Sequence, residues 1–576
     1  MPEGTNMQLI DATPVSTSLP QREGKVLTLC LAWVRRYGLV LITYIGATWL
    51  TDPHFMGDTV GYAGAILTPK FWETAHLLLY PIGWLLSQVF MPFTRLVFGA
   101  DARTNVIMTL ITINWLAGLL SIFMIHSLAS RISGREWAAN LTTIAFILSQ
   151  GFLDYAQTGC SYVPGLALLL LSLYLLVRDG ENAAPSFRKG LPAGLALAGA
   201  VGLWFPYVLS VPAVLAAPLF LFGRQHRRWQ FVLQTFVAFA LITTLMYGGA
   251  AALNHIRTGA GFMEGFSSSA RYMTAVTGIN GAPRTAFGLA RSFLNVGNDG
   301  RMYKRFLLHD PLNPVSFVDL FRLSLGKLLL FYACVGGMIA TLLRVAPGRR
   351  ILGLLLLNSI PVITFGLLWQ GGDMERYLPL YPLFFASLAY AVGSDRSSLL
   401  FKFIAIVFVV TVAATNAGAM APAVSDRRQA QVVARIEDLV PLLNANSLVA
   451  TINQQDEVWA FYWTFPFHPI NRAGSLSVYE IMNPGTSMAP HWRERFASRV
   501  LSTWAAGGDM WISKRVLSPH PRGEWNWVEG DDSRVTWADL YGFFSHLEHG
   551  KSSGGDDGFW LLSPSSSNRD VLMSLR

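Results

Sequence analysis

Long apolar runs recur through the first 420 residues and are separated by short polar loops. Most of these runs approach the roughly 20 residues that an α-helix needs to cross a bilayer. In the apolar stretch 191–223, the sequence Trp204-Phe205-Pro206-Tyr207 predicts a break between two short spans, because proline interrupts helices and aromatic residues favour the membrane surface. The pattern therefore predicts a mainly α-helical, polytopic membrane bundle of about eleven crossings. The other predicted spans are 36–50, 104–127, 137–153, 161–177, 229–253, 318–344, 350–369, 377–394 and 399–418.

The apolar stretch 76–98 does not fit this series, because it contains Pro81, Trp84, Pro92 and Arg95. Lysine and arginine in short loops favour the cytoplasmic side. All the short basic loops can be cytoplasmic only if 76–98 does not cross the membrane. This stretch is therefore expected to form a helix that lies along the outer membrane surface. The alternative is a true span there, which would force at least one basic loop outward. The basic loops carry Arg35-Arg36, Arg131 with Arg135, Arg178 with Arg188-Lys189, Arg224 to Arg228, Arg344 to Arg350, and Arg396.

This arrangement divides the chain into three parts. We expect a cytoplasmic tail over 1–30, a transmembrane domain over 31–420 with long outer loops at 51–103 and 254–317, and a soluble extracytoplasmic domain over 421–576. The first 25 residues lack the apolar core of a signal peptide, so the first span is expected to stay in the protein as an anchor.

The soluble domain has a different pattern, in which short β-branched runs alternate with helical ones. Strands are predicted at 447–452 and 509–513, and helices at 428–443 and 491–505, which together predict a small α/β layer. The stretch 549–558 is rich in Gly, Ser and Asp and predicts a flexible loop.

Composition and charge support the membrane assignment. Hydrophobic residues make up 52% of the chain and charged residues only 14%, against roughly 25% in a soluble protein. The net charge of +9 is uneven, since residues 421–576 carry 14 basic and 17 acidic residues and the rest carries 30 and 18. Basic loops between spans are expected to set the topology and to contact lipid phosphates. Because the soluble part is slightly acidic, no nucleic-acid partner is expected.

Candidate chemistry begins directly after the first span, in the loop that contains Asp52 and Asp58. If a helix starts there, Asp58 and Tyr62 share one face, because residues four apart are neighbours on a helix. The alternative is that Asp58 only caps a helix that begins at Thr59.

Three sequence features occur in order along the chain. Asp58, Tyr62 and Ala63 form the pattern Asp-x-x-x-Tyr-Ala in the first outer loop, and the stretch 76–84 predicts a surface helix with a proline-containing start. An Arg-Tyr followed by a Leu-Pro-Leu-Tyr-Pro run lies at 376–382. Together these features resemble the GT-C superfamily of polytopic membrane glycosyltransferases, such as the protein O-mannosyltransferase and aminoarabinose transferase types. At the second feature the family usually has His/Lys-Pro-Pro-Leu, whereas this chain has a single proline and no lysine.

The resemblance implies transfer of a sugar from a polyprenyl-phosphate-linked donor to an acceptor on the outer face of the membrane. A carboxylate there can deprotonate the acceptor hydroxyl or hold a metal, and arginine suits the departing phosphate. We therefore expect Asp58 to be the catalytic residue, as base or metal ligand. The supporting residues are expected to be Asp52, Tyr62 and His76, and the residues that bind the donor phosphate Arg376, Arg271 and Arg284.

The same resemblance suggests a bacterial inner (plasma) membrane, with membrane lipids and the polyprenyl-phosphate sugar as partners. The acceptor stays open between a lipid, a polysaccharide and a protein. No organic cofactor is expected, and a divalent metal such as Mg²⁺ or Mn²⁺ is compatible with Asp58 as its ligand.

Each of these assignments has a simpler alternative. Arg376 could pair with Glu375 or Asp373, or extend toward the membrane surface. Basic residues of the second outer loop could only attract anionic lipids, and His76 could be an ordinary interfacial histidine. At the level of the whole protein, the alternatives are a transporter of glycoconjugate or lipid, or a non-catalytic scaffold with a binding domain at its C-terminus.

Overall fold

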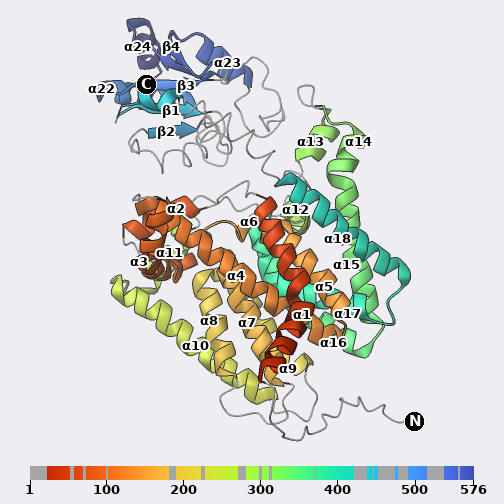
Figure 1. The fold of residues 1–576 in the computed structure, drawn as a ribbon. Helices are drawn as coiled ribbons and strands as arrows, with labels where there is room; N and C mark the ends of the chain where they lie inside the picture. Colours follow the sequence, from red (N-terminus) through yellow and green to blue (C-terminus); the bar gives the residue numbers. More distant parts are fainter. Residues whose placement is uncertain are drawn as a thin grey trace, which may run out of the picture.

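Every element described in the first 420 residues is a helix, whereas the C-terminal part holds a five-stranded sheet (Figure 1). This computed structural model describes residues 22–51, 58–68, 73–98, 102–180, 190–221, 228–269, 281–296, 301–309, 314–369, 371–420, 438–444, 446–451, 474–477, 491–514, 537–555 and 558–575. One large cluster of buried apolar side chains joins the helices, and separate clusters lie around the sheet.

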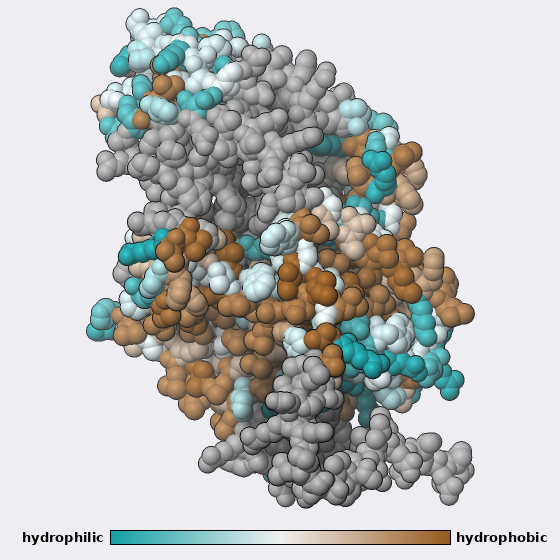
Figure 2. Space-filling view, viewed as in Figure 1, coloured by the Kyte–Doolittle hydropathy of each residue, from teal (hydrophilic) through white to brown (hydrophobic). Residues whose placement is uncertain are grey.

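Five helical segments in the described part of the chain are long and apolar enough to cross a membrane. They lie in α4 (Ala102–Ser133), α10 (Arg228–Leu253), the continuous segment of α14, η4 and α15 (Phe317–Leu343), α16 (Ala346–Leu368) and α18 (Leu399–Ala419). Hydrophobic residues dominate the surface of the helical bundle in Figure 2, whereas the described part of the sheet unit is mostly hydrophilic. The chain is therefore an integral membrane protein, while the number of crossings remains a prediction.

The predicted break in 191–223 coincides with a change of helix. α8 (Leu191–Leu203) ends directly before Trp204, and the short 3₁₀ helix η2 (Phe205–Ser210) leads into α9 (Val211–Leu221). α7 (Tyr162–Gly180) packs against α8. The proline in this sequence lacks the N–H that a continuous helix needs, which explains the interruption.

Two predicted spans are less regular than expected. The run 137–153 is divided into α5 (Glu136–Leu148) and α6 (Gln150–Tyr155), because Ser149 is extended and its hydroxyl donates to the carbonyl of Phe146. The run 377–394 begins in a 3₁₀ helix, η5 (Met374–Leu380), and only then continues as α17 (Tyr381–Gly393). Local side-chain bonding and prolines favour such interruptions.

Basic residues from three of the predicted cytoplasmic loops gather at one end of the bundle. Arg36 of α1 (Arg22–Leu50) lies 3.5 Å from Glu136, and Arg135 lies 2.7 Å from Asp395. The guanidinium groups of Arg131 and Arg178 both lie over the ring of Tyr174, at 6.0 and 5.7 Å from its centroid. We call this the basic end. These loops were predicted to share one side of the membrane, and the structure brings them together.

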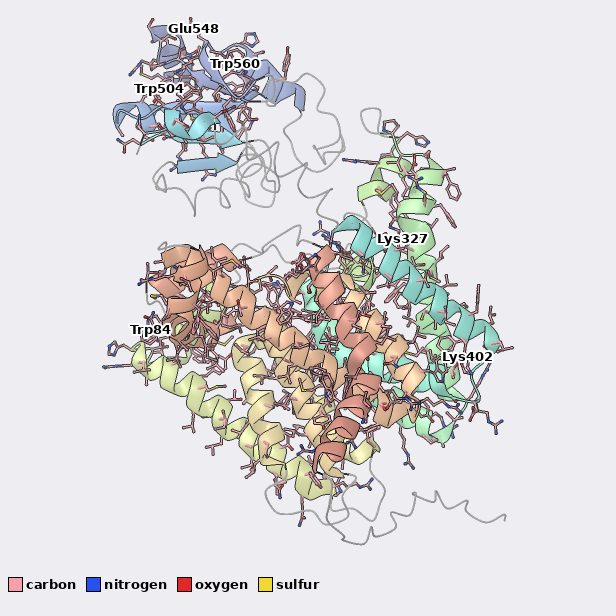
Figure 3. All side chains as sticks on the ribbon, in the orientation of Figure 1. Trp84, Lys327, Lys402, Trp504, Glu548 and Trp560 are labelled. Atoms are coloured by element: carbon pink, nitrogen blue, oxygen red, sulfur yellow. The ribbon has the colours of Figure 1, made fainter. Side chains whose placement is uncertain are left out.

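The opposite end of the bundle, nearer the sheet in Figure 1, carries helices that are not among the five candidate spans. They are α2 (Thr59–Leu67), η1 (Thr74–His76), α3 (Leu79–Phe98), α11 (Gly259–Ser269), α12 (Gly281–Phe293) and α13 (Arg301–Leu307). We call this the sheet-proximal end. α3 contains Pro92, is not among the five candidate spans, and exposes 44% of Trp84 at its surface (Figure 3).

The C-terminal sheet has the strand order β2-β1-β3-β5-β4. β1 (Leu448–Thr451) pairs in parallel with β2 (Gly474–Ser477) and β3 (Met510–Ser513), and β5 (Phe559–Leu562) pairs antiparallel with β3 and β4 (His549–Ser553). The helices of this part are α22 (Trp492–Ala505), α23 (Trp537–Ser545) and α24 (Ser566–Met573).

The predicted strands at 447–452 and 509–513 and the predicted helix at 491–505 are present as β1, β3 and α22. The predicted loop at 549–558 is wrong, because residues 549–553 form the edge strand β4 and only the following turn is a connection. Gly554 and Gly555 take positive φ angles of 70° and 63°, which glycine adopts readily in hairpin turns. Pairing with the buried strand β5 outweighs the weak strand propensity of this polar segment. Of the predicted helix 428–443, only its last residues are among those described.

Candidate functional site

Asp58 immediately precedes α2, as expected, but its side chain does not cap that helix. Instead, its Oδ2 accepts hydrogen bonds from the hydroxyls of Tyr62 and Tyr162, at 3.3 and 3.5 Å. Tyr62 lies one turn along α2, so the predicted shared face is real. The capping alternative for the carboxylate is therefore wrong, and Asp58 points into a cluster of polar side chains.

Contacts between α2 and the segment before α7 bring Tyr162 to this position. The backbone N–H of Gly159 donates to Thr59 Oγ1 at 2.9 Å, which ties the start of α2 to that segment. The carbonyl of Tyr162 accepts from Tyr207 Oη at 2.6 Å, and its ring lies 4.8 Å from that of Trp204. The 204–207 break thus supports the residue that holds Asp58.

His76 lies beside Tyr62 and is engaged on both sides of its ring. Its Nε2 is 3.0 Å from Tyr62 Oη, and its Nδ1 is 2.7 Å from Ser161 Oγ. Burial lowers the pKa of His76 to about 4, so the imidazole is neutral near neutral pH. It therefore cannot supply a positive charge for a phosphate.

Arg376 reaches the same cluster from η5 and is only 8% exposed. Its guanidinium lies 3.8 Å from Glu375 and 3.9 Å from Asp373, and it sits 5.7 Å from the centroid of the Phe365 ring. Burial alone would lower the pKa of Arg376, but the two carboxylates outweigh it and raise the pKa, so the group stays charged. The predicted alternative of pairing with Glu375 and Asp373 is thus what the structure contains, at distances longer than a close bidentate pair.

Asp58 and the η5 residues are electrostatically coupled. Asp58 is exposed to solvent as a residue. The surrounding protein nevertheless raises the pKa of its carboxyl group, chiefly through desolvation and then through the negative charge of Glu375. Hydrogen bonds from Tyr62 and Tyr162 and the charge of Arg376 act in the opposite direction. A carboxylate whose pKa is raised in this way is a stronger base than an ordinary aspartate.

The position of η5 is determined by α12, which packs against it. Tyr377 Oη donates to the carbonyls of Thr285 and Gly371, at 3.2 and 2.6 Å. The hydroxyl of Tyr381 bonds to Ser292 near the other end of α12. Sequence spacing could not reveal the bonds to Thr285 and Ser292, because they join residues 92 and 89 positions apart.

The structure therefore brings together four of the seven predicted site residues: Asp58, Tyr62, His76 and Arg376. Arg284 is exposed on α12, which packs against η5, but no described contact joins its side chain to the cluster. Asp52 and Arg271 lie outside the described residues. Sequence reasoning did not assign site roles to Ser161, Tyr162 or Glu375, and the last of these accepts a hydrogen bond from Tyr155 Oη at 2.9 Å.

A metal ion has a limited set of ligands in the described cluster. Asp58 contributes one carboxylate, and the described residues contain no group of three or more His, Cys, Asp or Glu side chains placed to hold a metal. Asp58 as the ligand of a divalent metal therefore remains a prediction.

Fold and site together define a polytopic helical membrane protein with a cluster of acid, base and hydrogen-bonding groups at one end of its bundle. Among solved structures, the chain is similar to ArnT from Cupriavidus metallidurans bound to undecaprenyl phosphate, with a TM-score of 0.51, 11% identity, and coverage of 95% of this chain and 99% of that one. The apo state of the same ArnT gives a TM-score of 0.50 at 11% identity, covering 94% of this chain and 99% of that one.

The Archaeoglobus fulgidus oligosaccharyltransferase tethered with an acceptor peptide is a more distant match, with a TM-score of 0.45, 10% identity, and coverage of 93% of this chain and 75% of that one. No protein-family model and no curated protein sequence matches the chain. At these identities the similarity to ArnT establishes the fold, and the fold is the one that the sequence resemblance predicted.

Proposed function

We propose that the protein is a membrane glycosyltransferase that moves a sugar from a polyprenyl-phosphate-linked donor to an acceptor hydroxyl. The observation that carries this proposal is the set of contacts that connects Asp58, before α2, to Arg376 of η5. Tyr162 bonds to Asp58, its ring lies 4.7 Å from that of Tyr155, and Tyr155 bonds to Glu375, which pairs with Arg376. Such a transfer needs a base for the acceptor hydroxyl and a cation for the departing phosphate at one site.

In the proposed reaction, Asp58 takes the proton of the acceptor hydroxyl while that oxygen bonds to the anomeric carbon of the sugar. The bond from this carbon to the phosphate oxygen breaks, and the polyprenyl phosphate leaves with the electron pair. Arg376 stabilises the negative charge that develops on the phosphate, since a guanidinium can contact two phosphate oxygens at once. Arg284, and Arg271 from the same outer loop, are proposed to assist in binding the donor.

The fold supports a lipid-linked donor. An ArnT structure that contains undecaprenyl phosphate has the same fold across nearly its full length. A polyprenyl chain stays in the bilayer, so its phosphate must be met at the membrane surface, and the cluster lies at one end of the helical bundle. The acceptor stays open between a lipid, a polysaccharide and a protein.

We further propose that the basic end faces the cytoplasm, so that the sheet-proximal end, the reaction site and residues 421–576 lie outside a bacterial inner membrane. The gathering of Arg36, Arg131, Arg135 and Arg178 at one end supports this orientation. The C-terminal sheet lies beyond the sheet-proximal end of the bundle (Figure 1), which makes it a candidate for docking the acceptor.

The proposal is tested with purified full-length protein in lipid nanodiscs and a panel of undecaprenyl-phosphate-linked sugars. Release of undecaprenyl phosphate is measured with membrane-lipid, polysaccharide and peptide acceptors. We expect the wild type to turn over at least one donor, and Asp58→Asn to lose about 10²- to 10⁴-fold in rate. Asp395→Asn, the same change at the basic end, is the matched control and should keep full activity.

A transporter or a scaffold would give a different result. Either would bind or move undecaprenyl-phosphate sugars without cleaving them, and Asp58→Asn would not alter cleavage because there would be none. Equal turnover by the wild type and Asp58→Asn would likewise exclude the role assigned to this carboxylate.

A further inference from the structure

Asp58 is the end of a hydrogen-bonded chain that passes through three separate segments. Ser161, just before α7, lies 2.7 Å from His76 Nδ1, and His76 Nε2 lies 3.0 Å from Tyr62 Oη. Tyr62 in turn lies 3.3 Å from Asp58 Oδ2. The chain Ser161–His76–Tyr62–Asp58 thus links the loop before α7, η1 and α2 to the proposed base.

The number of protons available to each group determines which atom donates in each hydrogen bond of this chain. An ionised Asp58 only accepts, so the single phenolic proton of Tyr62 must point toward it. The oxygen of Tyr62 then accepts from His76, which requires the imidazole proton on Nε2. A neutral histidine has one N–H, so Nδ1 accepts in turn from the hydroxyl of Ser161.

A second tyrosine contacts the same carboxylate oxygen. Tyr162 Oη is 3.5 Å from Asp58 Oδ2, so both tyrosine hydroxyls reach Oδ2. Two donors on one oxygen restrict rotation of the carboxylate about its Cβ–Cγ bond. The other oxygen, Oδ1, is then the one presented to an incoming acceptor.

We propose that His76 is a positioning residue, which together with Ser161 directs the hydroxyl of Tyr62 and so holds Asp58 with Oδ1 available as the base. This inference rests on the proposed function of Asp58. It also gives His76 a different task from the phosphate contact that its place in the sequence resemblance would suggest.

The surroundings of His76 agree with a neutral ring. Its imidazole lies 6.1 Å from the ring of Tyr162. Burial and the nearby positive charge of Arg376 lower the pKa of His76, and together they outweigh the backbone of Leu203, which acts in the opposite direction. Both ring nitrogens are occupied by protein hydroxyls, so binding a phosphate would require breaking one of these bonds.

The decisive measurement is the tautomer of His76, read from the ¹⁵N chemical shifts of its ring in full-length protein in nanodiscs. The His76 signals are assigned by their loss in His76→Gln. We expect Nε2–H in the wild type and in Asp58→Asn, whose amide oxygen still accepts from the tyrosines. In Asp58→Ala no acceptor remains, so Tyr62 turns its proton to Nε2 and the tautomer changes to Nδ1–H.

Buried His126, which lies 3.0 Å from Asn140 near the basic end, is the internal control and should give the same shifts in every sample. A wild-type Nδ1–H form would overturn the proposal, and so would a tautomer that does not respond to Asp58→Ala. This readout does not depend on turnover, so it remains decisive if no donor in the panel is cleaved and the proposed function fails.

A kinetic measurement tests the consequence for catalysis. With a donor that the wild type turns over, His76→Phe should lower kcat by about 10- to 100-fold with little change in KM. Misplacement of a reacting group lowers the rate by factors of this size. His76→Gln keeps an N–H donor for Tyr62 and should recover part of that loss. Tyr44→Phe, which removes a buried hydroxyl bonded to the carbonyl of Trp115, is the control and should leave kcat unchanged. Equal rates for Phe and Gln at position 76 would contradict the positioning role.

Discussion

Glu375 is the residue that connects the two groups proposed to carry the reaction. Its Oε1 lies 3.8 Å from Arg376, its Oε2 accepts from Tyr155, and its negative charge raises the pKa of Asp58. One carboxylate thus keeps Arg376 charged and at the same time makes Asp58 a better proton acceptor. This double role is a property of the cluster rather than of any single motif.

Glu375→Gln should therefore shift the acidic limb of the pH–rate profile to lower pH. Asp58 acts as a base only when ionised, so activity falls as the pH drops through its pKa. Desolvation is the main cause that raises this pKa and Glu375 the second, so removing the Glu375 charge lowers it. The profile of kcat against pH is compared with that of Glu494→Gln, an exposed position on α22, which should match the wild type. If the acidic limb of Glu375→Gln stays at the wild-type pH or moves to higher pH, Glu375 does not raise the pKa of Asp58.

The pairing of Asp58 with Tyr62 could be predicted because the two residues are four positions apart at the start of one helix, and such spacing is a local signal. Tyr162, Ser161 and Glu375 were missed as site residues because they come from segments far from Asp58 in the sequence. Tyr162 and Ser161 stand at the end of a predicted span, so the topology placed them at the correct membrane surface, but it could not say which way their hydroxyls point. Nothing local in the sequence marks a chain of hydrogen bonds across three segments.

At the scale of elements, the close packing of α12 on the segment before η5 positions Arg376. A Cβ at Gly288 would overlap the carbonyl oxygen of Gly371 and lie 3.0 Å from the Cα of Gly372.

Since backbone atoms cannot move aside like a flexible side chain, Gly288→Ala should displace α12 and lower the stability of the protein by about 1–3 kcal/mol. Thermal unfolding in detergent measures this, and turnover should fall with it. Gly249→Ala in α10, where a Cβ meets nothing within 4 Å, is the control and should be neutral or slightly stabilising. Equal Tm values for the two variants would contradict this account.

A buried asparagine joins the end of α5 and the end of α12 to α18. Asn416 donates to the carbonyls of Leu148 and Phe293, at 2.7 and 2.9 Å, and accepts from the N–H of Asn295 at 2.8 Å. Asn295 is also bonded to Lys327, which Figure 3 labels on α15.

Asn416→Leu should destabilise the protein by about 1–3 kcal/mol, because buried backbone groups would lose their partner. Thermal unfolding of the same detergent-solubilised protein checks this value. Thr411→Val, which removes only a bond within α18, provides the comparison and should change stability by no more than about 0.5 kcal/mol. If both variants unfold at the wild-type temperature, Asn416 does not act as a link.

Element positions were predicted best where a strong local signal marked them. The break at 204–207 carries a proline and three aromatic residues, and the helices end and begin there. Ser149 and the start of η5 carry weaker signals within apolar runs, so their irregularity was not predicted. β4 was taken for a loop because its residues have little strand propensity, and its conformation depends on pairing with β5, a contact that composition does not show.

At the scale of the whole molecule, the distribution of charge was more informative than any single motif. Arginines from three loops, up to 142 positions apart in the sequence, were predicted to share one side of the membrane, and they meet at the basic end. Asp58 and Arg376 lie away from that end. A bundle with one basic end and one reactive end has a definite expected orientation, because short basic loops are retained in the cytoplasm.

This orientation is tested by labelling single cysteines from outside intact cells. In a background with Cys30, Cys160 and Cys334 replaced by alanine, a cysteine is introduced in the sheet unit by Lys551→Cys or at the basic end by Asp395→Cys. Both positions are exposed, the aspartate side chain by 85%, so accessibility of the site itself does not limit labelling. With the outer membrane made permeable, a membrane-impermeant maleimide should label Lys551→Cys at once, and Asp395→Cys only after the inner membrane is also opened. The reverse pattern would place the reaction site in the cytoplasm, where a donor exposed on the outer leaflet could not reach it.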